Sequence, residues 1–445
     1  MQRMPGETSQ QPQLKRVIGL SGAMMMGLGS IIGTGVFVSL GIGAGIAGPS
    51  VLLAIMLAAG VAMCNGLSSA QLAANHPVSG GTYEYGHRWL NPSLGFTAGW
   101  MFLCAKSASS ATAALGFAGY IAHATGMGAS LPLAVGVVVL VTVIALSGIE
   151  RSNRVNIVIV SIVILALMIF VGAGFSSAVK NKAAFQPIFD GGKLTDLLQA
   201  TALMFVAFTG YGRIATLGEE VAEPRRTIPR AVIVTLLISM ALYLLVAFVG
   251  IGVNGFENLD GSLALASKSV SNAALPTVML VGATVAMVSV LLNLVLGLSR
   301  VVLAMGRRGD LPKATARISE STHVPAVATV GVAVLIAGWV CVGDVKLTWS
   351  FSAFTVLVYY AITNLCAIRM KPGERLYPIW PAYLGLAACL TLAFFVDWGI
   401  WLTGLGLIII GLAWRACFNA KRATASPRRC FRRSGVVLGR GLLPG

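Results

Sequence analysis

Apolar runs of membrane-spanning length recur along almost the whole chain, and short polar or charged stretches separate them. A bilayer's hydrocarbon core is crossed by an α-helix of about 20 apolar residues. A helix satisfies its own backbone hydrogen bonds in hydrocarbon, whereas irregular chain does not. We therefore predict an all-α membrane protein with about 12 transmembrane helices. The predicted spans lie near 17–39, 49–73, 93–118, 130–149, 155–175, 196–218, 231–253, 276–304, 325–342, 348–368, 379–396 and 398–416.

The composition excludes an ordinary water-soluble protein. Hydrophobic residues make up 56% of the chain and charged residues only 11%, against roughly a quarter charged in soluble domains. The formal net charge of +17 would suit nucleic-acid binding, but the charges lie in short clusters between apolar runs. We therefore expect a lipid bilayer around the chain and no nucleic-acid partner.

The distribution of Lys and Arg between successive loops predicts the orientation. One set of alternate loops, together with both termini, holds most of these residues. Cytoplasmic loops carry such an excess, so we expect a multi-pass protein of the plasma (inner) membrane with both termini in the cytoplasm. The opposite loops hold only Lys180, Lys182, Lys193, Lys268 and Lys346.

The sequence lacks the usual signatures of a metal site, a membrane enzyme or an ATP-driven pump. Its seven cysteines form no CxxC pair, and the chain contains neither an HExxH nor a GxxxxGK[ST] motif. We expect no cofactor, no metal and no enzymatic activity.

Glycines are concentrated within the first predicted span. Gly27, Gly29, Gly33 and Gly35 fall within nine residues, a density that weakens a helix. Such a segment is either a deliberate break, whose free N–H groups bind an anionic group such as a carboxylate, or a surface for close helix packing. The glycines alone do not separate these readings.

The sixth span offers a counterpart at residues 205–213 (FVAFTGYGR). Interrupted helices at corresponding positions of two halves indicate a binding site between repeats, so the pairing favours breaks in both spans. The first and sixth spans are five apart, which predicts two repeats of five helices. The expected divisions are a cytoplasmic N-terminus at 1–16, repeats at 17–175 and 176–368, two accessory helices at 369–416 and a basic cytoplasmic tail at 417–445.

Four stretches resemble motifs of the amino acid–polyamine–organocation superfamily of transporters. They occur in the family's order and spacing, and the resemblance covers roughly residues 15–415. It implies the five-plus-five inverted-repeat fold, alternating access and amino acids as the usual substrates. The stretches are 29–37 (GSIIGTGVF), 77–83 (PVSGGTY), 218–230 (GEEVAEPRRTIPR) and 299–312 (SRVVLAMGRRGDLP).

The same resemblance implies a substrate site at the two breaks. The substrate carboxylate would meet Gly33, Thr34 and Gly35, and its amino group would meet carbonyl oxygens near Ile31 and Phe208. Phe208 and Tyr211 would wall the side-chain pocket, although ordinary core packing explains each of these aromatic residues nearly as well. The substrate-binding candidates are Ile31, Gly33, Thr34, Gly35, Phe208, Thr209, Gly210 and Tyr211.

Lys106 departs from the family pattern, since many relatives carry an aromatic residue near this position. It lies in the middle of the third span among small residues. A lysine at that depth costs at least roughly 2.5–3.5 kcal/mol on insertion scales, and it is too far from either end for easy snorkelling. We interpret Lys106 as a functional charge, either a coupling site that gains and loses a proton or a fixed cation facing a substrate carboxylate.

Arg213 is a second departure, because it follows the sixth-span break where relatives often have a smaller or acidic residue. It either lines the inner half of the pathway or pairs with Glu219 or Glu220. These two glutamates and Arg300 are gate candidates, alongside Arg225, Arg226 and Arg307, although solvated loop charges are an equally good explanation. Asn293 is expected to hydrogen-bond between helices, and His76 and His87 are given no role beyond pH sensitivity.

The acidic residues complete the functional prediction. All 15 of them fall in loops, termini or span ends, so the pocket should disfavour cations. We predict a secondary active transporter of neutral or acidic amino acids, with protons as a candidate coupling ion. Two related alternatives are an amino acid exchanger and a polyamine or organic-cation carrier. A non-transporting amino-acid sensor or receptor remains as a different class.

Overall fold

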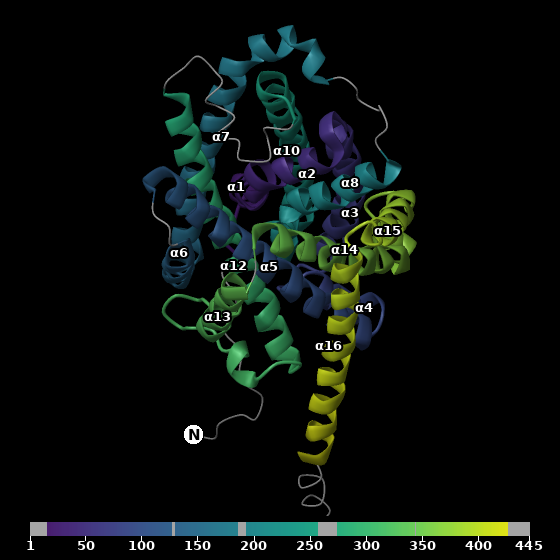
Figure 1. Cartoon of the computed structure of the whole chain (residues 1–445). Helices are drawn as coiled ribbons and strands as arrows, with labels where there is room; N and C mark the ends of the chain where they lie inside the picture. The colour runs from purple at the N-terminus through teal and green to yellow at the C-terminus, as the bar shows by residue number, and fades with distance from the viewer. Residues whose placement is uncertain (1–15, 127–129, 186–192, 257–273, 343, 426–445) are drawn as a thin grey trace, which may run out of the picture.

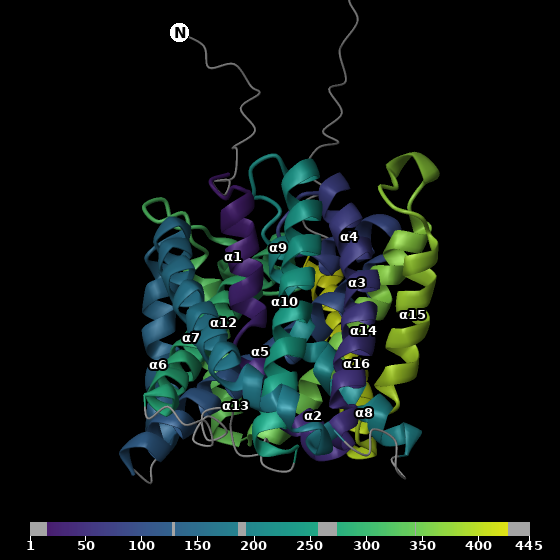
Figure 2. The ribbon, with the colours of Figure 1, turned by 90° about the horizontal axis from the view of Figure 1, so that it is seen from above.

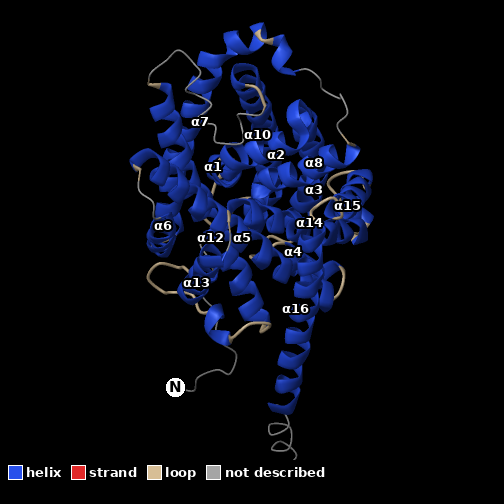
Figure 3. Cartoon of the chain, in the orientation of Figure 1, coloured by secondary structure: helices blue, strands red, loops and turns tan. Residues whose placement is uncertain are grey.

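The computed structural model describes residues 16–126, 130–185, 193–256, 274–342 and 344–425. Throughout these ranges the chain folds into helices joined by short loops, and no β-strand occurs in them (Figure 3). The all-α fold class predicted from the sequence is therefore confirmed. Most of the N-terminal segment 1–16 and the end of the basic tail, 426–445, lie outside the described residues.

The helices follow the predicted spans closely. They are α1 (Leu20–Ile31), η1 (Gly35–Ser39), α2 (Leu40–Ala47), η2 (Gly48–Ser50), α3 (Val51–Asn75), α4 (Thr82–Trp89), α5 (Pro92–Thr125), α6 (Ser130–Leu146), α7 (Ile149–Lys180), η3 (Lys182–Phe185), α8 (Leu194–Phe208), η4 (Thr209–Tyr211), α9 (Gly212–Thr216), α10 (Pro224–Asn254), α12 (Leu275–Arg308), η7 (Lys313–Ala316), α13 (Ala326–Val342), α14 (Val345–Arg369), η8 (Pro372–Glu374), α15 (Trp380–Ala393) and α16 (Trp398–Ala425). The last helix continues past the predicted end of its span at 416.

The predicted number of membrane spans fits the structure. Within the described residues, six helical stretches are long and apolar enough to cross a membrane, and three shorter apolar helices accompany them. One of the six, Leu20–Asn75, contains two of the predicted spans. The long helix α5 and the interrupted α8–α9 segment supply the remaining two.

The helices stand side by side as a bundle, with α1 next to α10 (Figure 2). Helix α5 runs through the middle of the bundle and packs on both α12 and α14 (Figure 1). Small residues on α5 allow this close approach, and paired hydroxyls join it to α14. The oxygen-to-oxygen distances are 2.6 Å between Ser109 and Ser352 and 2.7 Å between Thr112 and Thr348.

The outer surface of the bundle is apolar. Side chains such as Val139, Leu165 and Ile409 are exposed on α6, α7 and α16. Exposing so many apolar side chains to water is energetically unfavourable, whereas contact between them and lipid is not. The bundle therefore presents a surface suited to a bilayer and buries polar residues of its spans such as Lys106 and Asn293.

Candidate functional site

The first predicted break is present between α1 and η1. Helix α1 ends at Ile31, and Ile32 adopts an extended conformation with φ −78° and ψ 95°. The chain then resumes as the short π-helix η1, and the N–H of Phe37 near its start donates to Gly33 O, which precedes the helix, at 2.9 Å. The interruption falls inside the glycine-rich segment, because glycines weaken the interior of a helix.

The second break is a tightening of the helix and not an unwound segment. Helix α8 ends at Phe208, a single 3-10 turn covers Thr209–Tyr211, and the short helix α9 continues from Gly212. The Tyr360 hydroxyl donates to the carbonyl oxygen of Thr209 at 3.2 Å. A neighbouring helix therefore satisfies a carbonyl group at this change of helix type.

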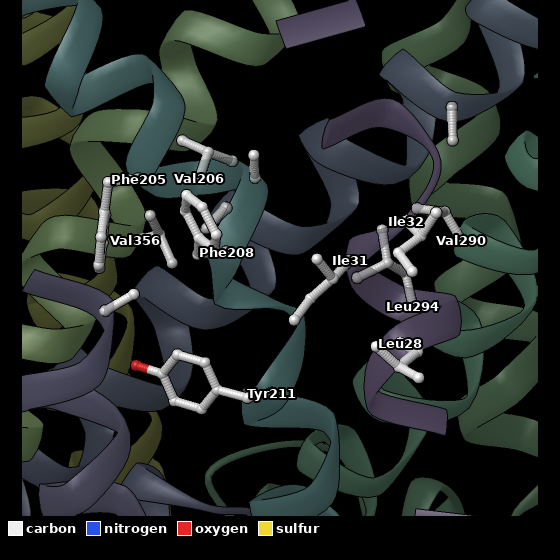
Figure 4. Close-up of a cluster of buried hydrophobic side chains, with 14 of the residues drawn as sticks. Leu28, Ile31, Ile32, Phe205, Val206, Phe208, Tyr211, Val290, Leu294 and Val356 are labelled. Atoms are coloured by element: carbon white, nitrogen blue, oxygen red, sulfur yellow. The ribbon is translucent and has the colours of Figure 1, made fainter. Parts of the chain in front are cut away.

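The two breaks touch each other through their backbones. A Cβ atom added to Gly210 would lie 2.6 Å from Ser30 O and 2.6 Å from Ile31 Cγ1. No side chain larger than hydrogen fits such an approach, so Gly210 is required for the contact. Figure 4 shows Ile31 reaching from the end of α1 toward the segment that carries Phe208 and Tyr211. The structure thus brings the predicted substrate-binding residues of both spans together.

Tyr243 of α10 joins the two breaks, and sequence reasoning missed it. Its hydroxyl donates to Ile31 O at 2.6 Å and lies 3.4 Å from Ala207 O. Gly35 faces the same hydroxyl so closely that a Cβ there would collide with it. The only signal in the sequence is a tyrosine in the middle of an apolar run, which ordinary packing explains equally well.

Aromatic residues surround the second break. The ring of Phe208 packs on that of Tyr243 with centroids 5.0 Å apart, and Tyr211 packs on Tyr360 at 5.4 Å. Phe208 and Tyr211 are fully buried. The second break is thus packed between aromatic side chains of α10 and α14.

Lys106 lies at the second break. Its side chain is 4% exposed, and its Nζ donates to Thr209 Oγ1 at 2.6 Å. The Thr209 hydroxyl in turn donates to Val206 O at 2.7 Å. None of the ion pairs formed within the described part of the chain includes Lys106. A buried ammonium group therefore contacts the break without a carboxylate partner.

A polar cluster joins the end of α1 to α7 and α12. The amide nitrogen of Asn156 donates to Met25 O at 2.9 Å, and its side-chain oxygen accepts from the Ser289 hydroxyl at 2.9 Å. Asn293 also donates to this Asn156 oxygen. The inter-helix role predicted for Asn293 therefore matches its geometry, but Asn156 at the centre of the cluster was not predicted.

Glu219, Glu220, Arg300 and Arg307 lie at one end of the bundle, which we name the polar end (residues 17–18, 76–88, 217–223 and 300–310), whereas the gate candidates Arg225 and Arg226 lie outside these ranges and are exposed. Both carboxylate oxygens of Glu220 accept from Arg300, at 2.8 and 3.3 Å, and both side chains are buried. Glu219 accepts from Arg307 at 2.9 Å and from the backbone N–H of Ser79 at 3.0 Å. The two glutamates thus join three segments that are distant in sequence.

Backbone contacts close the polar end further. The N–H groups of Val17 and Ile18 donate to Glu220 O at 3.0 Å, and Ala222 N–H donates to Ile18 O at 2.8 Å. The start of α1 is thereby tied to the chain that follows α9. Any movement of α1 away from the bundle at this end must break these bonds.

Two ionisable residues of α4 have shifted pKa values at the polar end. Burial raises the pKa of Tyr83 well above its usual range, and its hydroxyl donates to Asp310 at 2.6 Å. Burial lowers the pKa of His87, whose Nδ1 contacts Tyr83 O at 2.8 Å. Both groups are therefore held in their neutral forms near pH 7.

No metal-binding cluster of three or more His, Cys, Asp or Glu side chains occurs among the described residues. The chemistry of this site consists of backbone carbonyl groups, hydroxyls, aromatic rings and buried cations.

The comparison with known families decides the class of this protein. The family model for amino acid permeases matches residues 22–426. The chain belongs to the amino acid permease family. The motifs that predicted this membership all lie within the matched region.

Individual relatives agree with this assignment. The permease is 40% identical over 412 residues to an uncharacterized transporter of Mycobacterium tuberculosis, covering 90% of this chain and 91% of the relative. It is 29% identical to a branched-chain amino acid permease of Bacillus subtilis, over 74% and 75% of the two chains. The solved structure of MhsT in complex with L-phenylalanine has a TM-score of 0.65 and 13% sequence identity, covering 87% of this permease and 100% of that chain. This last likeness establishes the fold alone.

Proposed function

We propose that this permease is a secondary active transporter that moves amino acids by alternating access, with the substrate held between the two breaks. The observation that carries the proposal is the backbone contact of Gly210 with Ser30 and Ile31. Two interrupted helices that meet inside a bundle present backbone groups unused by helical hydrogen bonding to a solute. The amino group would bind near Ile31 O and the carboxylate near Gly33, Thr34 and Gly35.

The charges around the breaks favour neutral or acidic amino acids over cationic ones. Lys106 and Arg213 are buried cations beside the second break, whereas the buried carboxylates of the described residues, Glu84, Glu220 and Asp310, belong to the polar end. A positive potential in the low-dielectric interior repels cationic side chains. The branched-chain amino acid permease among the relatives is consistent with a neutral substrate.

Lys106 is proposed as the coupling residue, with protons as the coupling ion. Its ammonium group contacts Thr209 at the break, and none of the ion pairs within the described residues includes it. An unpaired buried amine favours loss of its proton, and the protonated form would attract a substrate carboxylate. Binding of a proton at Lys106 would then raise the affinity for the substrate, and binding of the substrate would raise the affinity for the proton.

The polar end is proposed as the cytoplasmic gate, which is closed in this structure. Glu220 with Arg300 and Glu219 with Arg307 join the segments that would separate when the site opens inward. The excess of Lys and Arg in the loops at this end supports a cytoplasmic orientation.

Uptake by proteoliposomes tests this function. Purified permease should accumulate leucine, glutamine or glutamate above the level of empty vesicles, and an imposed pH gradient should increase the rate. Lysine and arginine should compete poorly. Uptake that requires an internal amino acid would identify an exchanger, and binding without uptake would identify a sensor. Preferential uptake of lysine would refute the charge argument.

A further inference from the structure

Arg213 is a buried arginine without a partner. It lies on α9, just past the second break, and its side chain is 4% exposed. None of its three side-chain nitrogens, Nε and the two terminal ones, has a hydrogen-bond partner within the described part of the chain. A guanidinium group stays protonated in proteins, so this residue carries a full positive charge inside the bundle.

The carboxylate whose charge acts on Arg213 already has a partner. Glu220 and Arg300 are the charged groups that act on Arg213, and both oxygens of Glu220 accept hydrogen bonds from Arg300. The three side chains therefore comprise two positive charges and one negative charge. Lys106 contacts the preceding turn at Thr209 and brings a further positive charge to this region.

The aliphatic part of the Arg213 side chain packs beside a glycine. Gly297 of α12 faces it, and a Cβ at Gly297 would lie 3.4 Å from Arg213 Cδ. Arg300 lies three residues farther along the same helix. Arg213 thus lies between the second break and the Glu220–Arg300 pair.

An unpaired buried charge is too costly to be retained for packing alone. The forked donors of a guanidinium group match the two oxygens of a carboxylate. We propose that Arg213 is an anion-binding site on the route between the breaks and the polar end, and that its ligand is a carboxylate or a small inorganic anion. The carboxylate would be the side chain of a dicarboxylic amino acid, a source that rests on the proposed function. The inorganic anion would be a free ion such as chloride.

The experiment measures binding by the purified full-length protein and by Arg213→Gln. L-Glutamate and L-glutamine differ in side-chain charge but little in shape, and chloride is titrated at constant ionic strength with isethionate as the replacement anion. Arg226→Gln is the matched control, because Arg226 is 79% exposed and its ion pair within the described residues is with the exposed Glu223. Arg213→Lys keeps the positive charge but removes the forked donors of the guanidinium group. This variant replaces Arg213→Gln in the experiment if the glutamine variant folds poorly.

If the ligand is a substrate side chain, the wild type should bind glutamate more tightly than glutamine. Arg213→Gln should then lower the ratio of the two affinities by about tenfold or more. If the ligand is a free anion, chloride should stabilise the wild type and Arg226→Gln but not Arg213→Gln. In either case Arg213→Gln without anion should melt at a higher temperature than the wild type, since an uncompensated charge is gone. Glutamate and chloride responses that are unchanged by Arg213→Gln would overturn the proposal. Failure of the wild type to bind any amino acid, with an intact chloride response, would refute only the proposed function.

Discussion

The hydroxyl of Tyr243 donates a 2.6 Å hydrogen bond to Ile31 O, the carbonyl oxygen at which the first helix ends. This is the group proposed to accept the substrate's amino group. Tyr243 therefore makes the hydrogen bond that the amino group of a bound amino acid would make in the proposed binding mode. It is an internal competitor located between the two breaks.

Tyr243→Phe should lower stability without substrate and strengthen substrate binding. Loss of the hydroxyl leaves Ile31 O without its donor, a cost of about 1–3 kcal/mol for a buried group. A bound ammonium group would recover that loss, so the rise in melting temperature on adding substrate should be larger than for the wild type. Thermal unfolding with and without saturating substrate measures both effects. A smaller rise would mean that the hydroxyl assists binding.

Lys106→Met should abolish uptake or remove its dependence on the pH gradient, while the protein still inserts and folds. The change deletes the only ammonium group in contact with Thr209 among the described residues. Proteoliposome uptake at several pH values provides the measurement. Lys346→Met, at an exposed lysine near the start of α14, is the control. Normal pH-dependent uptake by Lys106→Met would exclude a coupling role.

Gly210→Ala should push the two breaks apart. The added Cβ would lie 2.6 Å from Ser30 O, and crowding of this kind in a packed interior costs about 1–3 kcal/mol. Substrate affinity should fall with stability, because the backbone groups of both breaks would move. Gly331→Ala is the matched control, since a Cβ at that position of α13 meets no atom within 4 Å. Equal affinities for both variants would remove Gly210 from the site.

Gly33→Leu should block substrate binding. A Cβ at Gly33 already meets Val290 and the carbonyl oxygen of Ala286, so a leucine side chain would displace the segment proposed to hold the carboxylate. Equilibrium binding of a labelled amino acid tests this variant. Unchanged affinity would show that the first break does not contact the substrate.

Glu220→Gln should destabilise the closed state strongly. The substitution leaves Arg300 charged, buried and unpaired, which typically costs about 3–5 kcal/mol. Glu223→Gln, in an exposed pair with Arg226, should cost about 0–1 kcal/mol. Thermal or denaturant unfolding in detergent compares the two variants. A double variant, Glu220→Gln with Arg300→Met, should recover part of the loss, and no recovery would mean that the charge pair is not the cause.

The polar end should lose stability as the pH falls below neutrality. Burial lowers the pKa of His87, and burial together with Arg88 lowers the pKa of His76, both from an ordinary value of 6.5. Their neutral forms therefore stabilise the folded state fully above pH 6.5, and this contribution declines as the pH falls from 6.5 toward the lowered pKa values.

His87→Gln should flatten the dependence of the melting temperature on pH between about 7 and 5.5, the range in which histidine titrates. The exposed His123 provides a control substitution, His123→Gln. If the two variants keep the same slope as the wild type, His87 is not a source of the pH effect.

The sequence by itself determined the membrane class, the number of spans and the places where two of them are interrupted. These properties are local. A run of apolar residues either matches the thickness of the hydrocarbon or does not, and a cluster of glycines weakens a helix wherever the helix lies. The motifs around Gly33 and Glu220 then indicated the family. Lys106 stood out because a charge at that depth is costly in any transmembrane fold.

The tertiary structure decided which groups meet. Glu220 pairs with Arg300 and not with Arg213, the hydroxyl of Tyr243 reaches the end of α1, and Asn156 joins three helices. Each of these contacts depends on how helices distant in sequence are rotated and crossed, since a side chain's partner is set by the face that its helix turns inward. Hydropathy and spacing describe one helix at a time, so they locate the breaks but leave the residues opposite them undetermined.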